Sequence, residues 1–418
     1  MRANYQRWYT VFMNVYFSGI GGTGIGPLAE LAQDAGFTVF GSDLKPGAIS
    51  DELKDRQIEV SYGDQDGAFL RKKIDENGID WLVYTSALPE DHTELRVARE
   101  AGIKCTKRDE FLAELIRQKN LKMIAVAGTH GKTTTTAMII WAMMQLNIPV
   151  SYLVGTTISW GDGGKFDANS EYFVYEADEY DHNFLAYHPY LAAITCIDYD
   201  HPDIYPTIED YRAAFDKFMS QSENVVKDTT VNSGITLVGG LRRQDASIAL
   251  EVIEKIKPEL DFQKIVDVLN DFPGAGRRFE KITDGIYSDY GHHPNEIAST
   301  VKMAVELKMR DKYAGLAVIY QPHQNTRQHE VRHEYKHAFV GADKIFWLPT
   351  YLTRENPDLA VLTPEELVED TETKNQTEVA ELNDELAEKI RQLHDDNWLI
   401  VLMTAGPADG WLREHFAN

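Results

Sequence analysis

The chain has 418 residues, a length that predicts two to four domains, with three as the central expectation. Hydrophobic residues make up 43% and charged residues 26%, a globular composition that excludes a largely disordered chain. Because 66 acidic residues outnumber 42 basic ones, the formal charge of −24 excludes a general electrostatic attraction to nucleic acid or to an anionic membrane, so phosphates would need a local site.

The first segment alternates apolar strand patterns with helical patterns. Residues 14–18 predict a strand, which is followed by a glycine-rich turn. Further strands are predicted over 38–41 and 81–85, and helices over 27–35, 93–101 and 110–119. Alternation of this kind predicts a parallel sheet in an α/β, Rossmann-like domain. We place its end near residue 121.

The glycine-rich turn has the composition of a pyrophosphate-binding loop. It is formed by Gly19, Gly21, Gly22, Thr23 and Gly24, and Asp43 comes at the end of the next predicted strand. Glycines let a backbone approach a pyrophosphate, and a carboxylate in that position can hold a ribose. Alone, this pattern would suggest a nicotinamide-dependent dehydrogenase.

The second segment starts with a predicted strand over 122–127 and continues with strands over 172–175 and 191–196. Helices are predicted over 133–146, 207–222 and 246–256. The segment looks brief for a full α/β domain, because residues 225–238 predict little more than a short ordered run. A linker is predicted at Phe272-Pro-Gly-Ala-Gly, because Pro and Gly interrupt helices and strands.

The loop between the first strand and first helix of this segment resembles a shortened phosphate-binding loop. It is formed by Gly128, Thr129, His130, Gly131, Lys132, Thr133 and Thr134. Backbone amides of such a loop surround phosphate oxygens, Lys132 supplies a positive charge, and the Thr133 hydroxyl can bind Mg²⁺. A second phosphate loop in one chain favours ATP chemistry over a dehydrogenase.

Acidic residues and a histidine follow the next two predicted strands. Glu176, Asp178 and Glu179 come after the strand at 172–175, and His201 stands among carboxylates after the strand at 191–196. The carboxyl ends of parallel strands converge on one crevice, and carboxylate oxygens suit Mg²⁺. We therefore expect Glu176 and His201 to lie near the phosphate loop.

The third segment predicts strands over 286–288, 316–320, 344–348 and 399–404. Its polar motifs lie at linkers or strand ends and contain Arg278, Asp289, His292, His293, His323 and Arg327. Arginine can neutralise a transferring phosphoryl group, and a carboxylate can hold a ribose. The acidic stretch at 364–388 has apolar residues at helical spacing, which predicts a solvated helix face.

Two further observations concern the compartment in which the chain works. Cys105 and Cys196 are far apart in the sequence, which fits neither a zinc motif nor a disulfide framework. No apolar run approaches the ~18 residues of a membrane helix, and residues 1–10 lack a signal core. These features predict a soluble cytoplasmic protein without a membrane partner.

These motifs, in this order, resemble the Mur ligases, the ATP-dependent amino-acid ligases of peptidoglycan precursor synthesis. The resemblance spans about residues 14–410 and rests on the two phosphate loops, Glu176-Ala-Asp-Glu, Asp200-His-Pro-Asp, Gly276-Arg-Arg-Phe-Glu, Asp289-Tyr-Gly-His-His-Pro and Gln321-Pro-His. It implies a Rossmann-like domain for a UDP-sugar over 1–121, a shortened ATP-binding domain over 122–276 and a Rossmann-like domain over 277–418.

The resemblance also implies a reaction and a role for each motif. ATP would convert the carboxylate of UDP-N-acetylmuramate into an acyl phosphate, which the amine of L-alanine attacks. Lys132 and Arg278 would bind phosphates, Asp289 would contact the nucleotide, and Thr133, Glu176 and His201 would arrange Mg²⁺. The UDP-sugar would contact the glycine loop, Asp43 and Ser86, and the amino acid would contact His292, His323 and Arg327.

Two departures from the family pattern bear on specificity. The family usually has a longer central domain with a His-Asn pair that reads adenine, whereas here only residues 225–241 precede Arg242-Arg-Gln-Asp. The family's Pro-His-Arg is Pro322-His-Gln324 here. Phe215 replaces the carbamylated lysine of sister ligases, which agrees with the alanine-adding branch.

The alternatives are a ligase that attaches a murein tripeptide to the same UDP-sugar and a non-catalytic nucleotide or UDP-sugar binder. Both a monomer and a homodimer remain open.

Overall fold

The computed structural model describes residues 13–417 except 23, 48, 86, 87, 157, 159, 202, 203, 354 and 370. Its strands form three sheets. The first two sheets lie in a compact N-terminal unit that runs to Thr229 and includes Ile248–Val268. The third sheet lies in a C-terminal unit made of Thr230–Ser247 and residues from Leu269 onward. In the part of the chain described, no helix is long and apolar enough to cross a membrane.

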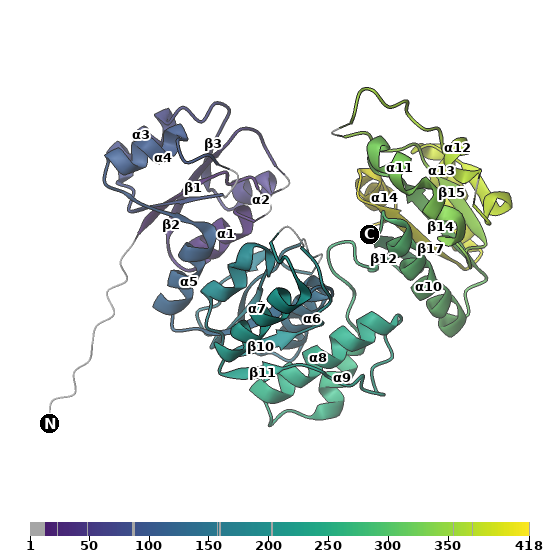
Figure 1. Ribbon diagram of the computed structural model, residues 1–418, viewed down its shortest axis with the longest axis horizontal. Helices are drawn as coiled ribbons and strands as arrows, with labels where there is room; N and C mark the ends of the chain where they lie inside the picture. The colour runs from purple at the N-terminus through teal and green to yellow at the C-terminus, as the bar shows by residue number, and fades with distance from the viewer. Residues whose placement is uncertain are drawn as a thin grey trace. The chain divides into compact units, whose positions relative to one another are not determined.

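The first sheet is entirely parallel, in the order β3-β2-β1-β4-β5. Its strands are β1 (Asn14–Ser18), β2 (Thr38–Asp43), β3 (Glu59–Tyr62), β4 (Trp81–Tyr84) and β5 (Lys104–Lys107). The helices between them are α1 (Gly26–Asp34), α2 (Ser50–Asp55), α3 (Ala68–Asn77), α4 (Thr93–Glu100) and α5 (Arg108–Gln118), with α3 and α4 side by side (Figure 1). The predicted parallel α/β fold is therefore confirmed.

The second sheet has the order β11-β10-β6-β9-β7-β8 and is parallel except for the β7–β8 pair. Its strands are β6 (Lys122–Ala127), β7 (Val150–Leu153), β8 (Gly164–Lys165), β9 (Tyr172–Glu176), β10 (Leu191–Ile194) and β11 (Asn224–Val226). Its helices include α6 (Lys132–Gln145), the 3-10 helix η1 (Tyr180–Ala186) and α7 (Ile208–Ser220). The expectation that this segment is too brief for a full α/β domain was wrong, because short edge strands complete a six-stranded sheet.

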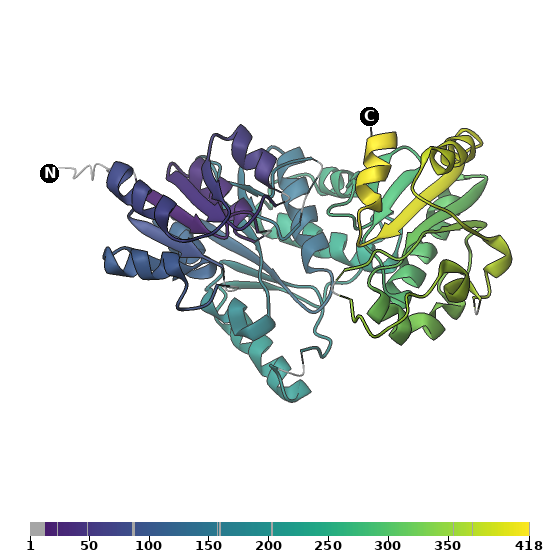
Figure 2. The same ribbon diagram turned by 90° about the horizontal axis from the view of Figure 1, so that it is seen from above.

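The third sheet has the order β12-β13-β17-β14-β15-β16, with only the β12–β13 pair antiparallel. Its strands are β12 (Glu280–Thr283), β13 (Ile286–Asp289), β14 (Gly315–Gln321), β15 (Lys344–Trp347), β16 (Thr377–Val379) and β17 (Trp398–Thr404). Figure 2 shows β17, in yellow, among the green strands. The helices are α10 (Pro294–Asp311), α11 (Asn325–Val331), η2 (Arg332–His337), α12 (Pro364–Val368), η3 (Lys374–Gln376), α13 (Asp384–Asp395) and α14 (Ala408–Phe416).

The acidic stretch at 364–388 is not the continuous helix face that its spacing predicted. A capping box at Thr363 starts α12, and the Asn383 side chain caps the start of α13 by accepting from Leu386 N at 3.0 Å. Between them the chain forms η3 and β16, which pairs with β15. Side-chain capping and strand pairing override the helical spacing here.

The predicted linker at 272–276 is a tightly packed turn. It lies between α9 (Phe262–Asn270) and β12, and Phe272 and Ala275 are buried. Gly274 has φ +99°, and a Cβ there would stand 2.7 Å from the Cα of Glu280. The turn belongs to the C-terminal unit, whereas α8 (Gly240–Ile256) and α9 each contain residues of both units.

The first two sheets of the N-terminal unit share a hydrophobic core and a charged contact. One cluster of buried apolar residues includes Phe17 and Phe111 from the first sheet's layers and Phe173 from the second sheet. Arg56, on the loop after α2, lies 3.3 Å from Glu30 and 3.1 Å from Asp162, which precedes β8. These contacts fix the first phosphate loop relative to the second.

The raised pKa of Glu30 predicts that the stability of the fold depends on pH. Its side chain is 2% exposed, and burial raises the pKa of Glu30 to about 7 despite Arg56. Because this pKa is raised on folding, the neutral form stabilises the fold at low pH, and that contribution is lost as pH rises through 7. Relative to Glu30→Gln, the wild type should lose on the order of 2 kcal/mol of unfolding free energy between pH 5 and pH 8.

Urea unfolding of both proteins at several pH values measures this difference. Glu110→Gln, on α5, serves as the control because Glu110 is exposed. Parallel pH profiles for wild type and Glu30→Gln would contradict the assignment.

Candidate active site

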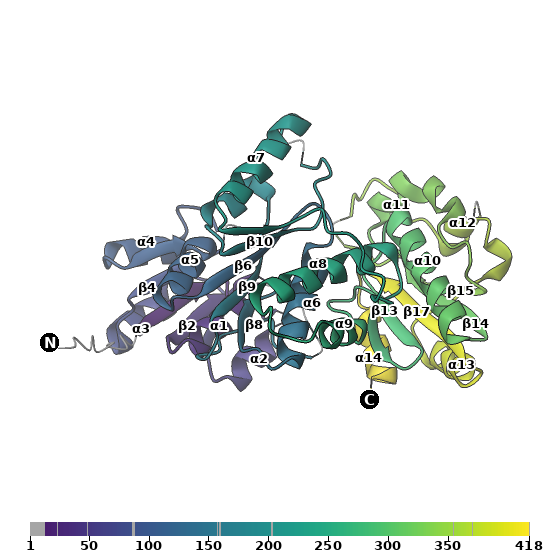
Figure 3. The same ribbon diagram turned by 90° about the horizontal axis from the view of Figure 1, so that it is seen from below.

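The phosphate loop follows β6, the strand that lies between β10 and β9 (Figure 3). Gly128 has φ +142°, and a Cβ there would stand 2.1 Å from Thr195 Oγ1. Gly131 has φ +80° and precedes α6, which begins at Lys132. The loop therefore needs glycine at both positions, and its amides lie at a helix N-terminus, where anions are stabilised.

Lys132 is held by a buried carboxylate. Its Nζ lies 2.8 Å from Glu179 Oε2 and donates to the Gly128 carbonyl at 2.7 Å. Glu179 is fully buried, and the Tyr205 hydroxyl donates to its carbonyl at 2.5 Å. Glu179 was noted in the sequence but given no role, because the spacing does not tell which acidic residue after β9 turns inward.

Thr133 and Glu176 meet as predicted. Thr133 lies in the first turn of α6, and its hydroxyl donates to Glu176 Oε1 at 2.9 Å. Glu176 ends β9, where it is paired in register with Val126 of β6. A hydroxyl and a carboxylate are hard oxygen ligands, so together they could hold Mg²⁺ beside a bound phosphate.

His201 lies close to Glu179. Its Nε2 is 3.8 Å from Glu179 Oε1, and its backbone has φ +56°. The residues with a described placement contain no cluster of three or more His, Cys, Asp or Glu side chains able to hold a metal.

The rest of the loop is braced by the segment after β10. The Thr129 hydroxyl donates to the Asp198 carbonyl at 2.6 Å and lies 2.9 Å from the Tyr211 hydroxyl. The Thr195 hydroxyl donates to the His130 carbonyl. Thr134 is the third residue of α6. The convergence of loops after β6, β9 and β10 is the arrangement expected from the strand pattern.

In the first sheet, Asp43 holds the glycine loop. The Gly21 N–H donates to Asp43 Oδ2 at 2.8 Å, and a Cβ on Gly47 would stand 2.3 Å from the Gly21 carbonyl oxygen. Gly19 has φ +84°, and the Gly22 N–H donates to its carbonyl at 3.1 Å. The predicted residues Thr23 and Ser86 lie outside the described residues.

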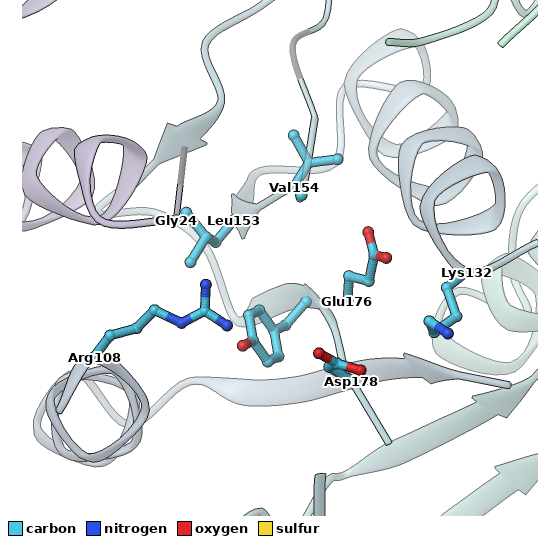
Figure 4. A pocket seen from close by; sticks show the side chains of 9 residues that line it. Gly24, Arg108, Lys132, Leu153, Val154, Glu176 and Asp178 are labelled. Carbon is cyan, nitrogen blue, oxygen red and sulfur yellow. The ribbon is translucent and has the colours of Figure 1, made fainter. Parts of the chain in front are cut away.

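One pocket in the N-terminal unit contains residues of both phosphate loops. Gly24 of the glycine loop lines it together with Lys132 and Glu176 (Figure 4). The other lining residues are Arg108, Leu153, Val154, Gly155, Tyr175 and Asp178. Arg108 was not predicted from the sequence, because an isolated arginine at a helix start belongs to no motif.

Five predicted site residues lie in the C-terminal unit: Arg278, Asp289, His292, His323 and Arg327. Asp289 is buried and accepts hydrogen bonds from Phe279 N (2.7 Å), Gly291 N (2.8 Å) and Thr300 Oγ1 (2.9 Å), and burial raises its pKa. The rings of His292 and His323 lie 5.7 Å apart. The two histidines therefore share one face of this unit, and the proposed ligand contacts of all five residues stay predictions.

Comparison with known proteins identifies the family. The model of the Mur ligase family catalytic domain matches residues 14–120, and the Mur ligase middle domain matches residues 126–232. UDP-N-acetylmuramate--L-alanine ligase of Carboxydothermus hydrogenoformans is 32% identical, over 82% of this chain and 83% of that protein. The ligase of the same name from Clostridium acetobutylicum is 30% identical, over 82% and 84%.

Solved structures show the same fold. UDP-N-acetylmuramate-alanine ligase from Thermotoga maritima superposes with a TM-score of 0.74 and 21% identity, covering 96% of this chain and 98% of that one. A murein peptide ligase from Psychrobacter arcticus gives a TM-score of 0.54 and 22% identity, covering 97% and 99%. This fold, the two matched domain models and the level of identity to the curated relatives establish that the chain belongs to the Mur ligase family.

Proposed function

We propose that this chain is an ATP-dependent ligase that joins L-alanine to UDP-N-acetylmuramate. The observation that carries the proposal is the pocket shared by Gly24 of the glycine loop and by Lys132 and Glu176 of the ATP site. A UDP-sugar on the first loop can then present its carboxylate to ATP on the second. The names of the curated relatives support this pair of substrates.

The three sheets divide the work in this proposal. Residues 1–121 hold the UDP-sugar, residues 122–276 hold ATP, and residues 277–418 supply contacts to the amino acid. Asp43 supports the UDP-sugar loop through Gly21. Arg278, Asp289, His292, His323 and Arg327 of the C-terminal unit are the residues that this proposal assigns to the nucleotide and the amino acid.

Each chemical step needs a group that the described site can supply. A carboxylate oxygen of the sugar attacks the γ-phosphorus of ATP and ADP leaves, so the charge that develops on the phosphoryl oxygens must be stabilised. Lys132 and the loop amides provide that stabilisation. The amine of alanine then attacks the acyl carbon, phosphate leaves, and the amine proton is released.

Magnesium fits the residues beside the phosphate loop. Thr133 Oγ1 and Glu176 Oε1 lie 2.9 Å apart and would hold the ion with the phosphates, whereas His201, near Glu179, would act through its neighbours. Bound there, Mg²⁺ would neutralise phosphate charge.

Glu176→Gln should raise the Mg²⁺ concentration needed for half-maximal activity by roughly 10 to 100-fold, because it replaces a charged carboxylate with a neutral amide. His201→Ala should raise it less, since His201 is the more distant group. Magnesium titrations of steady-state activity measure both effects. Glu171→Gln, which changes an exposed carboxylate directly before β9, is the control. Unchanged magnesium dependence in both variants would assign Glu176 and His201 structural roles only.

ADP release with defined substrates tests the proposed function. It should require both UDP-N-acetylmuramate and L-alanine, and other amino acids should support it less well. A stronger response to the tripeptide L-alanyl-γ-D-glutamyl-meso-diaminopimelate would favour the recycling ligase. ATP binding without ADP release under any of these conditions would favour the non-catalytic binder.

A further inference from the structure

Arg108 is an arginine of the pocket that no motif accounts for. It is the first residue of α5, and its Nε donates to Asp109 Oδ1 at 3.3 Å. The same oxygen accepts from the hydroxyls of Tyr175 (3.3 Å) and Tyr187 (3.2 Å), both from the second sheet's layer. Asp109 is thus fixed by two buried tyrosines and orients the guanidinium through Nε.

The other end of this guanidinium faces the pocket (Figure 4). Among the residues that the structure describes, neither Nη1 nor Nη2 has a hydrogen-bond acceptor. Nη1 lies close to the glycine loop, and a Cβ added to Gly24 would stand 2.4 Å from Nη1. Two donors in a fixed plane are therefore available beside the loop.

The charges around the pocket favour an anionic ligand at Arg108. Its lining contains two basic side chains, Arg108 and Lys132, and two acidic ones, Glu176 and Asp178. Glu179 already neutralises Lys132 at 2.8 Å. Glu176 and Asp178 would repel an anion that enters between them and the glycine loop, unless the positive charge of Arg108 offsets this repulsion.

We propose that Arg108 binds the UDP-sugar substrate through Nη1 and Nη2, by two hydrogen bonds to its reacting carboxylate. The inference rests on the proposed function. A planar guanidinium fits the two oxygens of a carboxylate. Arg108 lies on the pocket wall that also contains Gly24, and it faces the side where Lys132 and Glu176 would bind ATP. A pyrophosphate offers similar oxygens, so the test separates the two groups.

Calorimetric binding of three ligands without ATP provides the test. UDP carries only the pyrophosphate, UDP-N-acetylglucosamine adds the sugar, and UDP-N-acetylmuramate adds the carboxylate. Arg108→Ala should weaken UDP-N-acetylmuramate roughly 10 to 100-fold and leave the other two unchanged. Arg108→Lys should recover only part of the loss. Arg117→Ala, on the exposed side of α5, is the matched control.

Gly24→Ala gives a second test, because its methyl group would displace Nη1 while Arg108 itself is retained. Because Gly24 also belongs to the glycine loop, this variant should weaken the binding of UDP-N-acetylmuramate more than that of UDP, and its thermal unfolding shows whether the fold is kept. An equal loss for all three ligands would overturn the carboxylate contact in favour of the pyrophosphate, and unchanged affinities in the Arg108 variants would overturn any substrate contact. A wild type that binds none of the three ligands would instead refute the proposed function.

Discussion

Lys132→Ala should lower kcat by roughly 1000-fold while the affinity for the UDP-sugar stays within a few-fold of wild type. Lys132 is the positive charge of the phosphate loop, so its loss removes stabilisation of the transferring phosphoryl group. The glycine loop and Asp43, which we propose to hold the UDP-sugar, stay in place. Steady-state kinetics and a separate binding measurement with UDP-N-acetylmuramate check the two parts.

A structural effect of this change has to be separated from the catalytic one. Lys132→Ala leaves the buried Glu179 without its counter-charge, which typically costs about 3 to 5 kcal/mol of stability. The double variant Lys132→Ala/Glu179→Gln should regain stability but not turnover. Lys122→Ala removes an exposed lysine at the start of β6, the strand before the phosphate loop, and is the control. Turnover near the wild-type value in a folded Lys132 variant would remove Lys132 from the mechanism.

Gly128→Ala should abolish ATP binding and destabilise the fold. The new methyl group would stand 2.1 Å from Thr195 Oγ1 and 2.8 Å from the Cys196 carbonyl oxygen. In addition, the backbone at this position has φ +142°, a conformation that alanine avoids. Strain of this kind costs about 1 to 3 kcal/mol before the clash is counted. Thermal unfolding and ATP titration measure the two losses.

Gly240→Ala is the matched control, because nothing lies within 4 Å of the position of its added Cβ and its φ is not in the left-handed region. It should leave ATP affinity and stability near wild type. Equal behaviour of the two glycine variants would mean that the loop does not need its observed conformation.

The sequence predicted several of the strands that have strong apolar runs, but it missed β7 (Val150–Leu153), which is buried along its whole length. β6, β9, β10, β14 and β17 are buried along almost their whole length, and each was expected. β3 and β5 were missed because each contains few apolar and several polar residues. β16 was missed because its pairing with β15, rather than its own composition, makes it a strand.

The phosphate site was predictable where loops follow neighbouring strands, as the contact between Thr133 and Glu176 shows. Glu179 was not assigned because the irregular backbone after β9, with φ +51° at Asp181, decides which carboxylate turns inward. Arg108 could not be found because its place in the pocket depends on how the first two sheets pack together. Such contacts between layers leave no local pattern in a sequence.

In the proposed reaction, ATP activates the sugar carboxylate for attack by L-alanine. The direct measurement uses UDP-N-acetylmuramate with both carboxylate oxygens labelled with ¹⁸O, together with ATP, Mg²⁺ and L-alanine, and analyses the products by mass spectrometry. We expect UDP-N-acetylmuramoyl-L-alanine that retains one ¹⁸O and inorganic phosphate that has gained the other. Unlabelled phosphate, or ATP consumption without the alanyl product, would contradict this expectation.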